Sequence, residues 1–181
     1  MNASRKSLES ELYGEDCFYY HAAPIHWGKA LNNLKTLHDQ HLNIADSYKK
    51  RNVTTLYKDF AFDLVHSTLF FYYWIVYSDC YNLTKKYFSQ IHIPSITDSS
   101  SWTQLSNSLN ESMINNMQIA EYSYKNKGIV RFAQFFPKLS KHIIDEIDKE
   151  LAKHYGFTEE ELDFIINYDI KYRMGDELNE E

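Results

Sequence analysis

The spacing of apolar residues changes along this chain, from short runs in the front part to helical repeats in the rest. Short runs of aromatic and β-branched residues, separated by turns and polar stretches, are typical of strands. Between two of these runs, residues 31–45 fit either a helix or a loop. We therefore predict a small mixed β-sheet at the front of the chain, with strands at 18–20, 25–27, 53–57 and 90–93.

Apolar residues three and four positions apart predict helices in the remainder. A dense apolar helix at 59–77 leads into a polar turn at 78–82. A longer helix then ends at 126–128, before a short edge strand at 129–132. Its narrow apolar stripe indicates packing on another helix, either in the core or at a seam with a partner. The stripe consists of Trp102, Leu105, Leu109, Met113, Met117, Ala120 and Tyr124.

The last predicted helices carry their end signals in the sequence itself. Pro137 suits the first position of a helix, and Gly156 is typical of a helix C-terminus. Thr158, with Glu161 three residues later, is the signature of a capping box that begins the next helix. Because only a short connection separates the two helices, we expect them to fold back on each other as a helical hairpin at 137–172.

Together these elements predict an α+β fold, with an α+β region at 1–98 and a helical region at 99–181 that contains the long helix and the hairpin. A hydrophobic content of 44% in 181 residues suits a packed core and not a disordered chain. The two cysteines form no disulfide framework and no basic-apolar leader precedes them, so we expect a cytoplasmic protein. The longest apolar run, 69–77, is far shorter than the roughly 20 residues that span a bilayer, so no membrane partner is expected.

The net charge of −6 is distributed unevenly. Residues 1–141 hold 15 Lys or Arg and 12 Asp or Glu, a net of +3, whereas residues 142–181 hold 4 and 13, a net of −9. Phosphates repel an acidic helix pair, so a nucleic-acid surface would belong to the earlier part of the chain. The acidic helices themselves fit either a solvated face or a docking surface for a partner.

Four segments stand out for their sequence and their order along the chain. They read FYYHAAPIHW at 18–27, LVHSTLFFYYWIVYSDC at 64–80, FFPKLSKHIIDEID at 135–148 and YGFTEEELDFIINYDIKYRMG at 155–175. In this order they resemble the C-terminal, target-recognition side of restriction-modification N6-adenine DNA methyltransferases, of type II and of the type IIG methylase-specificity fusions. The last segment carries the resemblance most strongly, and the four together span nearly the whole chain.

The resemblance implies a part in site-specific DNA adenine methylation, in a prokaryotic cytoplasm. Enzymes of this family hold the flipped adenine with an Asn/Asp-Pro-Pro-Tyr/Phe motif and S-adenosylmethionine with a glycine-rich turn. Neither motif is present, since Pro24, Pro94 and Pro137 are not adjacent and the five glycines are scattered. We therefore expect a C-terminal fragment with no catalytic residues and no cofactor, inactive alone. S-adenosylmethionine is expected only in a separate methylase catalytic domain or subunit, which is the expected protein partner.

Double-stranded DNA is the other partner that the resemblance implies. Sequence recognition needs cations on phosphates and polar side chains at base edges. One basic cluster precedes a predicted strand and another follows the polar turn, so we predict that both lie in loops or at element ends. Solvated surface lysines are the alternative interpretation. The predicted DNA-binding residues are Lys49, Lys50, Arg51, Tyr81, Asn82, Lys85 and Lys86, of which Asn82 is suited to an adenine edge.

Other reactive residue types form no recognisable site. The histidines lack the cysteine or carboxylate partners at fixed spacing that zinc requires, so no metal site is expected. Cys80, with His66 upstream, lacks an orienting group for nucleophilic catalysis. The predicted function is DNA recognition and scaffolding for an adenine methyltransferase. The alternative is a protein-interaction module that docks its acidic helical hairpin on a methylase or restriction partner.

Overall fold

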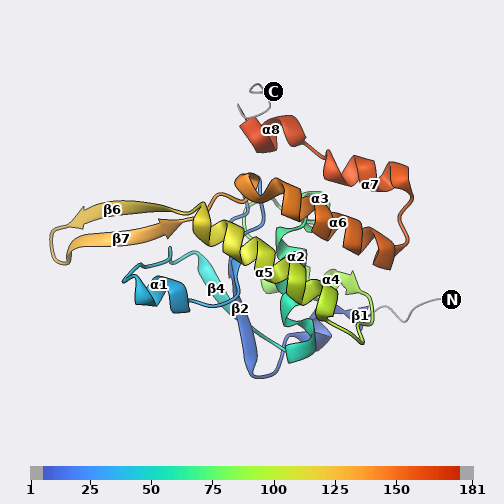
Figure 1. Cartoon of the computed structure of the whole chain (residues 1–181), viewed down its shortest axis with the longest axis horizontal. Helices are drawn as coiled ribbons and strands as arrows, with labels where there is room; N and C mark the ends of the chain where they lie inside the picture. Colours follow the sequence, from blue (N-terminus) through green and yellow to red (C-terminus); the bar gives the residue numbers. More distant parts are fainter. Residues whose placement is uncertain (1–5, 176–181) are drawn as a thin grey trace.

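Helix α2 (Lys58–His66) lies at the centre of the structure, where the helices and the main sheet meet (Figure 1). The computed structural model describes residues 6–175 and has an α+β fold, as the sequence predicts. Helices α3, α5 and α6 and strands β2 and β3 all contact α2. Because it has neighbours on every side, its residues from Phe60 to His66 are buried.

The front of the chain forms a three-stranded sheet in the order β3-β2-β4, antiparallel throughout where the sequence predicts a mixed sheet. The predicted strand at 18–20 lies within β2, but residues 25–27 form bends. Of the predicted strand at 53–57 only the first residue is in a strand, because residues 55–57 begin the turn that leads into α2. The strands are β1 (Lys6–Ser7), β2 (Asp16–His21), β3 (Ala30–Leu31), β4 (Tyr48–Val53) and β5 (His92–Ile93), with β1 paired to β5.

Two helices predicted as continuous are interrupted. Ser67 divides the helix predicted at 59–77, because its backbone is extended and its side chain accepts a hydrogen bond from the Phe70 N–H, which caps α3. The helix predicted at 158–172 ends at Ile166, and Asp169 then takes a left-handed φ of 55°. The helices are η1 (Leu8–Glu11), α1 (Lys35–Asp39), η2 (Thr55–Tyr57), α2, α3 (Thr68–Tyr77), α4 (Lys85–Gln90), α5 (Ser100–Asn115), η3 (Pro137–Ser140), α6 (Lys141–Tyr155), α7 (Glu159–Ile166) and α8 (Ile170–Met174).

Both predicted end signals of the helical hairpin are confirmed. Gly156 ends α6 with a left-handed φ of 74°. The capping box begins α7: the Thr158 hydroxyl oxygen accepts from the Glu161 N–H at 3.2 Å, and the Glu161 carboxylate accepts from the Thr158 N–H at 2.8 Å. Helices α6 and α7 then contact each other, as a hairpin requires.

A β-hairpin replaces the end of the predicted long helix. Helix α5 ends at Asn115, and β6 (Gln118–Tyr124) pairs antiparallel with β7 (Gly128–Gln134). The prediction was wrong because the helical spacing of apolar residues continues into β6, whose aromatic and β-branched content favours a strand. The connecting loop closes at Gly128, which has φ of 69°. Strands β6 and β7 project from the body of the molecule as an arm, here called the β6–β7 arm (Figure 1).

One hydrophobic core connects the front and back parts of the chain. Buried residues from Leu8 to Leu151 form a continuous cluster, in which the rings of Phe60 and Trp102 meet edge to face at 5.0 Å. The domain boundary near residue 98 stays a prediction. Within residues 6–175, no helix has both the length and the apolar character needed to cross a bilayer.

Candidate nucleic-acid interface

The first predicted basic cluster lies inside strand β4 and not in a loop before a strand. Strand β4 is at the edge of its sheet. Lys49 and Arg51 pair with Tyr20 and Phe18 of β2 and therefore share one face, whereas Lys50 pairs with Tyr19 and points to the other. Cations on an edge strand also prevent unwanted strand pairing, so this cluster has a structural role beside any contact with phosphate.

Arg51 is held more firmly than the two lysines. It is half-buried, and its guanidinium lies 5.8 Å from the centre of the Tyr20 ring. Lys49 and Lys50 are exposed, and the Lys49 ammonium donates only to the backbone carbonyl of Asp46, at 2.9 Å. The two lysines are therefore the members of this cluster that are free to contact a ligand.

The second predicted cluster lies in the turn before α4 and in its first turn. Tyr81 is 77% exposed and Asn82 is exposed, at the element end where the sequence places them. Lys85 is paired with Glu9 at 3.1 Å, while the Lys86 ammonium lies 5.7 Å from the centre of the neighbouring Tyr87 ring. Lys85 and Lys86 in the first turn of α4 interact unfavourably with the helix dipole, so their presence there is not explained by stabilisation of the helix.

The fold brings the two clusters to the same strand. Between them, the Leu83 N–H donates to the Ala22 carbonyl at 2.7 Å, which fixes the turn before α4 at the end of β2. Strand β4 pairs with β2 along its whole length. The predicted DNA-binding residues therefore border β2 from two sides.

The β6–β7 arm is a basic, exposed element that the sequence prediction missed. Its root is fixed because Asn43 donates to the Arg131 carbonyl and accepts from the Ala133 N–H, both at 2.9 Å. Residues 121–129 beyond this root are all exposed. Lys125 and Lys127 in the loop have no ion-pair partner among residues 6–175. The arm, residues 118–134, holds three Lys or Arg and one Asp or Glu, a net of +2.

The two faces of the arm differ in chemistry. Register places Tyr122, Tyr124 and Phe132 on one face, together with the amides of Gln118 and Gln134 at its root. Tyr122 and Phe132 meet edge to face at 5.7 Å. The other face carries Ile119 and Ile129 around an ion pair between Glu121 and Arg131 at 3.3 Å. One face is thus aromatic with polar tips, and the other is aliphatic with its charge neutralised.

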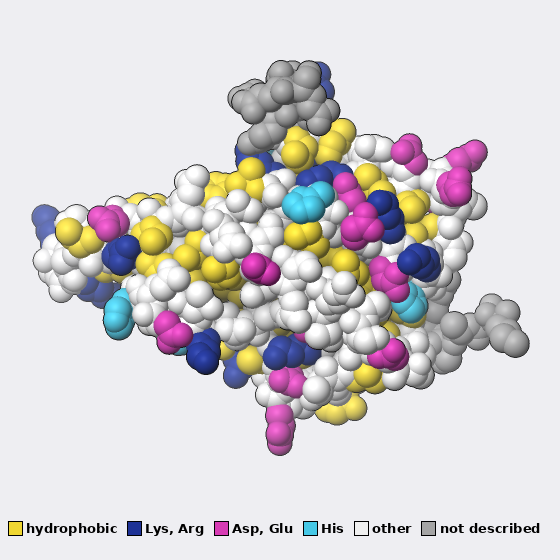
Figure 2. All heavy atoms as spheres, viewed as in Figure 1, with side chains coloured by type: hydrophobic (Ala, Val, Ile, Leu, Met, Phe, Trp, Pro, Cys, Tyr) yellow, Lys and Arg dark blue, Asp and Glu magenta, His cyan; other side chains and the backbone are white. Residues whose placement is uncertain are grey.

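Charge separates the two ends of the molecule. Residues 142–175 hold 4 Lys or Arg and 9 Asp or Glu, a net of −5. Figure 2 shows basic side chains at the end of the arm and carboxylates over the α6 and α7 end. A polyanion would therefore approach the arm and not the hairpin.

The four segments behind the family resemblance meet in the interior. Asp148 of the third segment accepts hydrogen bonds from the Thr68 and Leu69 N–H groups at 3.1 Å each, at the start of α3. Arg173 of the last segment donates to the Thr68 hydroxyl oxygen at 3.2 Å, and its guanidinium lies 3.9 Å from the centre of the Trp27 ring. Asp148, Thr68, Arg173 and Trp27 are buried, and Leu69 is half-buried. These buried contacts of the four segments therefore hold the fold together.

The side chains considered from the sequence for catalysis or metal binding do not form a site in the structure either. His66 is fully buried: its Nε2 accepts from the Ala30 N–H at 3.1 Å and its Nδ1 lies 3.0 Å from the Phe62 carbonyl. Cys80 is exposed and is not its partner. In the described part of the chain, no three His, Cys, Asp or Glu side chains are arranged to hold a metal ion.

Comparisons with protein-family models, with curated proteins and with solved structures found no match. The function is therefore inferred from the geometry of the chain itself.

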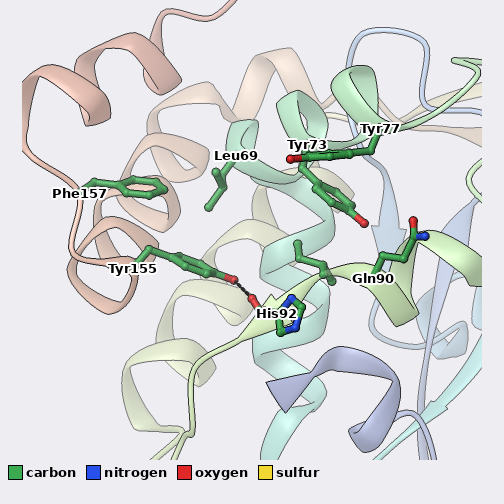
Figure 3. A pocket seen from close by; sticks show the side chains of 8 residues that line it. Leu69, Tyr73, Tyr77, Gln90, His92, Tyr155 and Phe157 are labelled. Atoms are coloured by element: carbon green, nitrogen blue, oxygen red, sulfur yellow. Dashed lines mark hydrogen bonds between the residues drawn. The ribbon is translucent and has the colours of Figure 1, made fainter. Parts of the chain in front are cut away.

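A second candidate surface is an aromatic groove between α3 and the α6–α7 hairpin. Its deeper part, about 610 Å³, is lined by Leu69, Tyr73, Tyr77, Gln90, Ile91, His92, Tyr155 and Phe157 (Figure 3). The Tyr155 hydroxyl donates to the His92 carbonyl at 2.8 Å and so closes one side. A shallower part of about 400 Å³ continues past Leu69 and Phe157 to Phe164, with Glu160 and Glu161 at its rim. An apolar segment with cations at its edge would fit this groove.

Proposed function

We propose that this chain is a non-catalytic module that binds double-stranded DNA for a restriction-modification adenine methyltransferase of a prokaryotic cytoplasm. The observation that carries the proposal is the projecting β6–β7 arm, with a cationic loop at the end of the molecule opposite its acidic hairpin. The sequence resemblance supports the choice of enzyme class.

In this function the chain positions and recognises DNA, and a separate methylase domain performs the chemistry. Lys49, Lys50 and Lys86 are exposed cations that can contact phosphates, while Arg51 and Lys85 already have protein partners. Adenine flipping and methyl transfer from S-adenosylmethionine belong to the methylase partner. The chain alone should bind DNA mainly through phosphates, with strong dependence on salt.

A charge-matched pair of variants tests the proposal. The β-side variant replaces Lys49, Lys50 and Lys86 with Gln, and the control replaces Lys149, Lys153 and Lys171, exposed lysines on the acidic helices, with Gln. Fluorescence anisotropy measures duplex affinity over a series of salt concentrations. Each phosphate contact contributes about 0.9 to the slope of log K against log salt, so the β-side variant should lose about 2 to 3 from that slope. No duplex binding by the wild type would refute the proposal, and equal slopes for the two variants would refute the phosphate contacts of Lys49, Lys50 and Lys86.

The aromatic groove supports a second function, docking on a protein partner. Its acidic rim favours a basic, partly apolar segment, as a methylase or restriction subunit could present. Removing the whole hairpin would not test this, because Ile144, Ile147 and Leu151 belong to the core. Substitution of the surface residues Glu160 by Lys and Phe164 by Ala leaves the core intact.

Co-purification with a methylase catalytic subunit measures the docking function. The groove variant should lose the partner, whereas a Glu111→Lys control, an exposed charge reversal on α5, should retain it. Equal retention by both variants would eliminate the groove as the docking surface. DNA binding by the isolated chain should be unaffected by the groove variant, which separates the two functions.

A further inference from the structure

The β6–β7 arm has the dimensions of an element that enters a DNA groove. Its two strands have seven residues each, which at about 3.3 Å per residue gives a ribbon about 20 Å long. The major groove of B-DNA is about 12 Å wide and accepts a two-stranded ribbon. Because the root is bonded to Asn43 and residues 121–129 are exposed, the outer part of the ribbon is free to enter while the body stays outside.

The chemistry of one face matches what base edges present in that groove. Tyr122 and Tyr124, in the exposed outer part of the ribbon, place hydroxyl groups on this face. Tyrosine hydroxyls and an asparagine amide are suited to the donors and acceptors of base edges. The amide of Asn126 lies at the loop, between Lys125 and Lys127, which are suited to the flanking phosphates.

Charge favours DNA over a protein occupant. Arm exchange between two copies would bring Lys125, Lys127 and Arg131 of both copies together, with only Glu121 on each arm to compensate. The arm has a net charge of +2, which suits a polyanion. The aliphatic face, where Ile129 is 70% exposed, would point away from the bases.

We infer that the β6–β7 arm enters the major groove of duplex DNA and reads base edges with its tyrosine and amide side chains. The inference rests on the proposed DNA-binding function and adds the element, the groove and the reading residues. Phosphate contacts from Lys49, Lys50 and Lys86 then position the body on the backbone beside the groove.

The test compares two duplexes of the same mixed sequence. In one, every cytosine is replaced by glucosylated 5-hydroxymethylcytosine, whose sugar fills the major groove and leaves the phosphates unchanged. The wild type should bind the glucosylated duplex at least about tenfold more weakly. An arm variant with Tyr122→Ser, Tyr124→Ser and Asn126→Ala should bind both duplexes with the same, weaker affinity. Because these three side chains are exposed or half-exposed on the arm, its urea midpoint should stay that of the wild type.

The β-side variant of Lys49, Lys50 and Lys86 is the matched control. It should bind both duplexes more weakly and still discriminate between them, because its arm is intact. Salt-dependent wild-type binding that is equal for the two duplexes would overturn the arm inference and leave the DNA-binding function standing. Absence of any duplex binding would overturn both.

Two further outcomes identify rival occupants. Arm-dependent dimers in sedimentation experiments would assign the arm to a second copy of this chain and overturn the inference. Arm-dependent binding that prefers single strands would assign the tyrosines to base stacking and would overturn it as well. A minor-groove ligand such as netropsin should not compete with the wild type, and competition would place the arm in the wrong groove.

Discussion

The guanidinium of Arg173 lies 3.9 Å from the centre of the Trp27 ring, and the Trp27 indole N–H donates to the Arg173 carbonyl at 2.9 Å. The same guanidinium donates from Nε to the His26 carbonyl at 3.0 Å. Helix α8 is thereby attached to the bend at residues 25–27, on the opposite part of the chain. The best-matching motif of the family resemblance therefore closes the fold, which explains why it need not contact DNA.

Replacement of Arg173 by Lys should destabilise the protein by about 2 to 4 kcal/mol. Lysine keeps the charge but loses the planar stack on Trp27 and the fixed set of donors to His26 and Thr68. Urea denaturation followed by tryptophan fluorescence measures the loss. Lys171→Gln, an exposed substitution on the same helix, should change stability by less than about 0.5 kcal/mol. Equal effects of the two substitutions would show that the stack contributes nothing.

Asp148→Asn tests the buried cap of α3. Burial raises the pKa of the Asp148 carboxyl to about 6, although the hydrogen bonds from Leu69 and Thr68 lower it in part. The group is therefore ionised at neutral pH. An amide offers one acceptor for two N–H donors, and its own NH₂ faces a donor. We expect a loss of about 3 kcal/mol, which lowers the melting temperature by about 6 to 12 °C. Glu146→Gln on the exposed face of α6 is the control, and a similar loss there would contradict the capping role.

Structural features that depend on residues close together in the sequence could be predicted. Contacts between residues far apart in the sequence could not. The capping box of Thr158 and Glu161 and the terminal Gly156 depend on a few neighbouring residues, so the hairpin was predicted correctly. Trp27 and Arg173 are 146 positions apart, and no local pattern indicates that they meet. Ser67 is an intermediate case, because its capping side chain was visible in the sequence but the apolar run around it suggested one helix.

The basic residues of the candidate site could be found from sequence, but their secondary structure could not. Lys49, Lys50 and Arg51 have a low strand propensity, and they form a strand because they pair with the aromatic strand β2. The arm had a usable signal, since polar and aromatic residues alternate over 121–124 before a loop that ends in Gly128. The helical stripe from Trp102 concealed it.

His66 should make the fold sensitive to acid. Burial lowers the pKa of its imidazole to about 4, and the neutral ring accepts from the Ala30 N–H and donates to the Phe62 carbonyl. Since the folded pKa is below the unfolded value of about 6.5, the stability it contributes is present above pH 6.5 and is lost as pH falls through about 4. The difference between the folded and unfolded pKa values of His66 corresponds to about 3 kcal/mol.

Asp148 acts in the opposite direction over part of this range. Its raised pKa means that its stabilising contribution is complete below about pH 3.8 and is lost as pH rises through about 6. Burial also raises the pKa of the Asp63 carboxyl, which acts in the same direction as Asp148, so His66 offsets only part of the fall in urea midpoint expected as pH rises from 4 to 6. His66→Gln should remove this offset, so that the urea midpoint of the variant falls more steeply over this range than that of the wild type. An unchanged profile in the variant would show that His66 does not govern acid sensitivity.

Gly28→Ala should prevent folding or cost about 3 kcal/mol or more, because a Cβ at this position would lie 1.7 Å from the Val65 carbonyl oxygen. That oxygen belongs to the buried helix α2, which cannot move without disturbing the core around it. Gly156→Ala is the control: its Cβ meets open space, and only the left-handed φ of 74° costs about 1 kcal/mol. Urea midpoints for the two variants measure the difference. Comparable losses would show that strand β3 and the bend around Trp27 do not approach α2 as closely as described.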